Sequence, residues 1–226
     1  MAEILGKVEK PAAQKFLGMR KLFLVPLVFS GKEAPEDYRE KVALFWRQAD
    51  EQLDSLEKRI GRVKKIYHES LTLGGDGGLK LVEQINGAGC PLIKKRCAQG
   101  AELVATEDMD LFAQSLDWGN CLRVVMSQAV FQRVSEFYRE ASERRFEYIS
   151  RRIADTLGEQ EAGVLFITEG HSVQFPPTIQ VFYVSPPALD DIHRWFRERT
   201  GGPGRPEQPE RTEREDKTGD SGVGGG

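Results

Sequence analysis

The stretch that decides the fold begins with KLFLVPLVF at residues 21–29, continues through a long helical repeat, and ends with RVKKIYHE at residues 62–69. The first segment is a short apolar run rich in leucine and valine, which is typical of a strand buried on both faces. Apolar residues then recur every three or four positions from Tyr38 to Ile60, which predicts an amphipathic helix that stops at Gly61. A strand, a helix and a second strand in this order predict a right-handed parallel crossover.

The segment that follows is predicted to be helical. Apolar spacing favours short helices over Gly77–Asn86 and Pro91–Gln99. Thr106 is placed to cap a third helix, which runs from Glu107 to about Trp118 and has three acidic residues near its start.

The longest helix is expected from Ser127 to Leu157, and Cys121–Met126 before it fits either a strand or a lead-in to that helix. An apolar stripe that includes Phe137 follows one face, and oppositely charged pairs at i,i+4 spacing follow the other. If the stripe faces a packed core, Phe137→Ala should cost about 3–5 kcal/mol of stability. Arg144→Ala, on the charged face, should cost less than about 1 kcal/mol.

The last third returns to strands, at Gly163–Thr168 and Ile179–Val184, before a terminal helix that starts at Ser185–Pro187. The whole order predicts an α/β protein, with a mixed α+β arrangement as the alternative. We expect a mixed sheet of about 4–6 strands covered by long amphipathic helices.

The two ends of the chain differ in composition from its body. Residues 201–226 are rich in glycine, proline and charged residues, and such a segment cannot bury enough apolar area to offset its ordering entropy. We therefore predict a disordered tail at 201–226, a single α/β domain at 13–200 and a loosely ordered N-terminus at 1–12.

Composition narrows the class of protein. The chain has 226 residues, a formal net charge of −3 and three cysteines. It is therefore not a basic protein overall, and three cysteines cannot form a disulfide framework. Its longest apolar run, Leu22 to Phe29, is far shorter than the roughly 20 residues that cross a bilayer. We expect a soluble, cytoplasmic protein without a membrane partner.

The candidate catalytic residues are Glu169 and His171, which follow a predicted strand, where sites in α/β proteins gather. Gly170 between them permits a bend that could aim both side chains into a cleft. A carboxylate beside an imidazole orients the ring and raises its basicity, as a general base requires. The competing interpretation is a solvent-facing turn, because the chain has no flanking catalytic motif.

Three functional hypotheses remain. The leading one is a non-catalytic interaction or regulatory module that binds a protein or another copy of itself, with no cofactor and no metal. The second is a hydrolase with its site at Glu169 and His171. The third is an RNA-associated, translation-linked factor that uses the basic cluster Lys58–Lys65, although the acidic chain as a whole argues against a nucleic-acid partner.

Overall fold

The apolar run near the N-terminus forms β1 (Arg20–Pro26), whose five inner residues are all buried. In the computed structural model β1 pairs in parallel with β4 (Ala162–Ile167) on one side and with β5 (Ile179–Tyr183) on the other. Beyond β4 the sheet continues with β2 (Val63–His68) and the short β3 (Glu102–Leu103), in the order β3-β2-β4-β1-β5. Because every pairing is parallel, the carboxyl ends of these strands meet at one edge of the sheet.

The predicted α/β class, strand number and covering helices are confirmed. The described strands are all parallel, whereas we expected a mixed sheet. The last two strands do not pair with each other, because β1 lies between them. Residues 168–178 therefore cross from one side of β1 to the other without a helix.

The structure describes residues 19–31 and 33–199. The loose N-terminus predicted at 1–12 and the disordered tail predicted at 201–226 lie outside the described residues. Within the described ranges, no helix has the length and apolar character that crossing a membrane requires.

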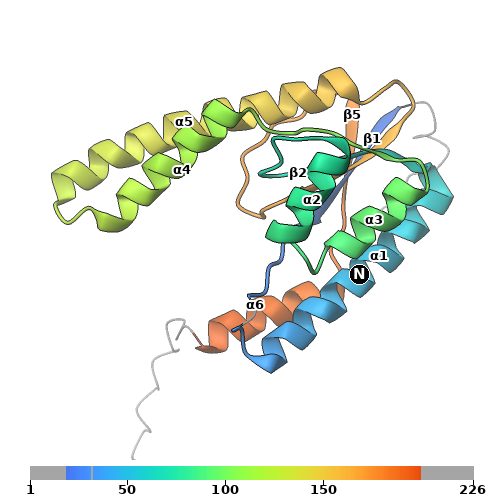
Figure 1. The fold of residues 1–226 in the computed structure, drawn as a ribbon, viewed down its shortest axis with the longest axis horizontal. Helices are drawn as coiled ribbons and strands as arrows, with labels where there is room; N and C mark the ends of the chain where they lie inside the picture. The colour runs from blue at the N-terminus through green and yellow to red at the C-terminus, as the bar shows by residue number, and fades with distance from the viewer. Residues whose placement is uncertain (1–18, 32, 200–226) are drawn as a thin grey trace, which may run out of the picture.

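Helices cover both faces of the sheet (Figure 1). One apolar core joins the sheet to α1 (Glu36–Ile60), α2 (Gly75–Ile85), α3 (Cys90–Ala98) and α6 (Pro187–Arg199). A second core joins the opposite face to the later half of α5 (Gln128–Thr156). The crossover from β4 to β5 packs into this second core, so the chain leaves β1 and β4 on opposite faces.

The helix predicted between the first two strands is α1, and its ends match the dipole rule. Glu36 and Asp37 lie in the first turn, and Lys58 and Arg59 lie in the last. Gly61 ends the helix with φ of 125°, a conformation that favours glycine. The residues of the predicted stripe that are buried are Tyr38, Val42, Phe45, Ala49, Leu53 and Ile60.

The third helix of the middle segment is α4 (Met109–Val124), and its start differs from the prediction. Asp108, not Thr106, is the N-cap, and its carboxylate accepts hydrogen bonds from two backbone N–H groups of the first turn. Thr106 is fully buried, and its hydroxyl accepts a hydrogen bond from the backbone N–H of His68 at 3.1 Å. Residues 121–124 are the last residues of α4, so they are helical but form neither a strand nor a lead-in to the next helix.

The longest predicted helix is α5, and Ser127 caps it as its position indicates. Its apolar stripe joins the second core only in the later half, at Ile149 and Ile153, whereas Ala141 near the middle is buried but belongs to neither core. Phe137 is 38% exposed and stacks on Trp118 of α4, with ring centroids 4.9 Å apart. The loss of 3–5 kcal/mol expected for Phe137→Ala required a packed core and therefore does not apply.

Candidate functional site

Glu169 and His171 both lie at the carboxyl edge of the sheet, as their position after β4 predicts. They line a cavity of about 320 Å³ that also receives residues from the ends of β1 and β5. Apolar side chains make up most of its wall. The two residues predicted from sequence therefore do lie in a cavity.

The two predicted residues are not hydrogen-bonded to each other in the described part of the chain. The Glu169 carboxylate instead meets His193 of α6, with 2.7 Å between Oε2 and Nε2. His171 uses its Nδ1 to accept a hydrogen bond from the backbone N–H of Val173 at 3.3 Å. The acid–imidazole pair at this edge is thus Glu169–His193, and a general-base role for His171 stays a prediction.

The protonation of His171 follows from its surroundings. Burial lowers the pKa of His171 below its ordinary value, and the negative charge of Glu69 opposes this shift only in part. The ring is therefore neutral at pH 7, with its proton on Nε2 because Nδ1 acts as an acceptor. A neutral ring adds no positive charge to the cavity.

A second polar cluster at the same edge joins three buried charged residues, Glu69, Glu107 and Arg145. The Arg145 Nε donates to Glu107 Oε2 at 2.9 Å, and its Nη2 donates to Glu69 Oε1 at 3.1 Å. Thr168 donates both its backbone N–H and its hydroxyl to Glu69 Oε2, each at 2.8 Å. Burial by itself would lower the pKa of Arg145. The hydrogen bonds and negative charges of Glu107 and Glu69 outweigh this effect, so the pKa lies above its ordinary value.

Our sequence reasoning missed this cluster, although the helical spacing contained a signal. Arg145 occupies a stripe position of α5, four residues from both Ala141 and Ile149, where an apolar side chain is expected. A charged residue at a buried stripe position requires a partner. The partners themselves come from the end of β2 and the loop before α4, which local spacing does not reveal.

His68 has a structural role at the end of β2. It is fully buried, and its Nδ1–H donates to the backbone carbonyl of Glu69. Its Nε2 accepts from the Asn86 side-chain amide at 3.4 Å. Burial lowers the pKa of His68, so the folded protein keeps this ring neutral.

Folding should therefore lose stability in acid through His68. The unfolded ring takes up a proton near its ordinary pKa of 6.5, whereas the buried ring resists protonation below that pH. Stability is thus fully present above pH 6.5 and falls below it, by up to about 1.4 kcal/mol per pH unit for one histidine. Urea unfolding of wild type and His68→Gln at pH 7.5, 6.5 and 5.5 measures the slope of the free energy of unfolding against pH. Equal slopes in the two proteins would remove His68 from the acid response.

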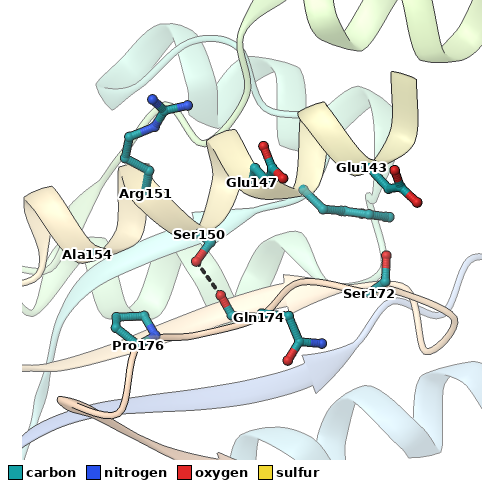
Figure 2. A pocket seen from close by; sticks show the side chains of 9 residues that line it. Glu143, Glu147, Ser150, Arg151, Ala154, Ser172, Gln174 and Pro176 are labelled. Carbon is teal, nitrogen blue, oxygen red and sulfur yellow. Dashed lines mark hydrogen bonds between the residues drawn. The ribbon is translucent and has the colours of Figure 1, made fainter. Parts of the chain in front are cut away.

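Another hollow lies between α5 and the crossover segment 168–178. Figure 2 shows Ser150 of α5 donating a hydrogen bond to the backbone carbonyl of Gln174 across this groove of about 550 Å³. Its charged side chains, Glu143, Glu147 and Arg151, are all exposed. The strand-end cavity is the better candidate site, because side chains from several strand ends converge there.

The basic cluster Lys58–Lys65 lies beside acidic residues. Lys65 forms an ion pair with Glu102 of β3. Lys58 and Arg62 line a small cavity together with Asp54 and Glu57 of α1. These carboxylates reduce the positive field that a nucleic acid would meet. RNA binding through this cluster stays an untested prediction.

No group of three or more histidine, cysteine, aspartate or glutamate residues that could hold a metal ion occurs within residues 19–31 and 33–199. Comparisons with protein-family models, with curated proteins and with solved structures each found no match.

Proposed function

We propose that the protein is an interaction module that pairs with a second copy of itself through the hairpin formed by α4 and α5. These two helices extend side by side, away from the sheet and the helices that cover it (Figure 1). In segment 109–140, Ser115 alone is buried. The projecting part of the hairpin therefore has no core of its own apart from the seam between the two helices.

The observation that carries the proposal is the apolar surface of this hairpin. Eight of the thirteen exposed large hydrophobic residues in the described chain lie between residues 109 and 138. They are Met109, Leu116, Val124, Met126, Val130, Phe131, Phe137 and Tyr138. Exposed apolar side chains that are concentrated in one part of a folded protein favour an interaction site there.

The tip of the hairpin is the most apolar part of this surface. Residues 124–132, VVMSQAVFQ, contain no charged residue. Val124 is 77% exposed and Met126 is 98% exposed. Charged residues are normally depleted at the centre of a protein interface, and this segment has that composition.

A second copy is the partner that fits this surface best. Two antiparallel helices make half of a four-helix bundle, and a two-fold axis would bring two hairpins together into a complete one. A symmetric contact places identical residues near the axis, where charged side chains would repel their own copies. The uncharged tip at 124–132 avoids that repulsion.

We further infer that the module works in a reducing compartment such as the cytoplasm. The support is the state of the cysteines, since Cys90, Cys97 and Cys121 are all unpaired in the structure. Unpaired cysteines are typical of proteins from compartments where thiols are kept reduced.

Sedimentation velocity of the full chain over a range of concentrations tests the proposal. Wild type should show a species of twice the 25.4 kDa chain mass. The double variant Val124→Ser, Met126→Ser should weaken dimerisation at least about tenfold, because central apolar residues carry most interface energy. Both side chains are exposed, so the monomer fold should tolerate the change.

Leu73→Ser is the matched control, since Leu73 is 55% exposed but lies outside the hairpin. This variant should dimerise as wild type does. A wild-type chain that stays monomeric at several hundred micromolar would contradict the proposal and leave a different protein as the partner. Equal dimerisation of the double variant and wild type would place the interface elsewhere.

A further inference from the structure

The cavity at the carboxyl edge lies at a topological switch point. After β1 the chain turns to the face covered by α1, and after β4 it turns to the opposite face, where Val173 packs in the core of α5. Neighbouring parallel strands whose connections leave on opposite faces create a crevice between them. In open α/β sheets this crevice is the usual place for a ligand. The cavity of about 320 Å³ occupies it and suits a small molecule.

The side chains of the cavity wall determine the polarity of the ligand that the cavity favours. The buried lining residues come from β1, β4, the position directly after β5, and α6: Val25, Ile167, Val184 and Leu189. Tyr183, which is 74% exposed, stands at the rim. Such a wall favours an apolar or aromatic body of small size.

The charged residues of the cavity determine which charge the polar group of a ligand should carry. Among the described residues that line it, Glu169 is the only carboxylate, and neither lysine nor arginine is present. His171 is neutral, so an anionic ligand would meet a carboxylate and no cation within the cavity. The Glu169 Oε2 is bonded to His193, whereas Oε1 has no hydrogen-bond partner among the described residues. One carboxylate oxygen thus remains able to accept from a cationic donor.

We propose that this cavity binds a small apolar amine, whose ammonium group pairs with Glu169 and whose apolar body lies beside the exposed ring of Tyr183, over the buried residues Val25, Ile167, Val184 and Leu189. The proposal is independent of the hairpin, because none of the described residues that line the cavity belongs to α4 or α5. It assigns Glu169 a binding role at the cavity mouth. It also explains why a half-exposed carboxylate stands next to an apolar wall.

Three probes of similar shape and different charge test it by titration in two-dimensional ¹H–¹⁵N NMR. Phenethylamine is cationic, 2-phenylethanol is neutral, and phenylacetate is anionic. Phenethylamine should shift the amide signals of residues 167–171 and 183–185 with a Kd in the millimolar range or tighter. The alcohol should bind at least about fivefold more weakly, and the carboxylate should cause no saturable shift, because only the cation pairs with Glu169.

Glu169→Gln should weaken phenethylamine binding to the level of the alcohol while leaving alcohol binding unchanged. Glu198→Gln is the control, because it removes an exposed carboxylate of α6 that does not line the cavity. This variant should bind the amine as wild type does. Equal affinity for the three probes, no saturable shift by phenethylamine, or unchanged amine binding in Glu169→Gln would each overturn the proposal.

Discussion

Arg145→Met is expected to lower the free energy of unfolding by about 3–5 kcal/mol, the usual cost of removing one partner from a buried ion cluster. The guanidinium is the common partner of Glu69 and Glu107, which are 7% and 4% exposed. Methionine fills similar volume but leaves two largely buried carboxylates without their cation. The loss should appear as a lower urea midpoint in equilibrium unfolding.

Arg144→Met is the matched control for this prediction. Arg144 is the neighbouring residue on α5 and is exposed, and among the described residues it donates only to the Glu140 backbone carbonyl of its own helix, at 3.3 Å. Its replacement should change stability by less than about 1 kcal/mol. If Arg145→Met does not fold, Arg145→Lys is the substitute variant. It retains the charge but loses the bidentate geometry of the guanidinium, so its urea midpoint should still lie clearly below that of wild type. Equal midpoints for Arg144→Met and Arg145→Met would show that the cluster contributes no net stability.

The cluster also explains how the hairpin is fixed to the sheet. Arg145 lies on α5 between the projecting half and the half that packs on the core, and it binds residues at the end of β2 and before α4. Arg152, about two turns further along, donates to the Ala105 carbonyl at 3.1 Å. Both bonds tie α5 to the segment that leads into α4. The hairpin is therefore held at its base by polar contacts.

The elements that could be predicted from sequence are those whose signal is local. The crossover from β1 through α1 to β2 follows from an apolar run, a helical repeat and a second apolar run, each in one stretch of chain. The start of α4 could not be predicted in the same way. Thr106 is a good capping residue, but its hydroxyl is used by the backbone of His68, 38 positions earlier. Asp108 caps the helix instead.

The candidate site also contains one part that local sequence predicts and one part that depends on tertiary packing. Glu169 and His171 reach the sheet edge because they directly follow a strand, and a strand end is a local property. The partner of Glu169 is not local, since His193 comes from α6 and approaches only when that helix packs on α1. By sequence spacing, His193 lies between Leu189 and Phe196 on the apolar face of α6, which favours a half-buried packing role. In the structure the side chain is 38% exposed and reaches the carboxylate.

The two halves of α5 show why a repeat alone does not measure burial. The stripe of apolar residues is continuous along the helix, yet its early members meet only α4 and its later members meet the sheet. A two-helix contact and a core contact require the same spacing of apolar residues. Only the packing partner separates them, and that partner is set by tertiary structure.

Ile153→Ala is accordingly expected to cost about 2–5 kcal/mol, as for other large-to-small changes in a packed core. Ile153 is completely buried among Leu22, Leu165 and other residues of the second core, so its loss leaves a cavity under the sheet. Phe137→Ala removes more atoms, but its ring is 38% exposed and contacts one neighbouring helix, so it should cost no more than about 1.5 kcal/mol. Urea unfolding at a concentration where the chain is monomeric keeps dimer contacts out of both values. A larger loss for Phe137→Ala than for Ile153→Ala would mean that the hairpin, and not the sheet, is the more tightly packed contact of α5.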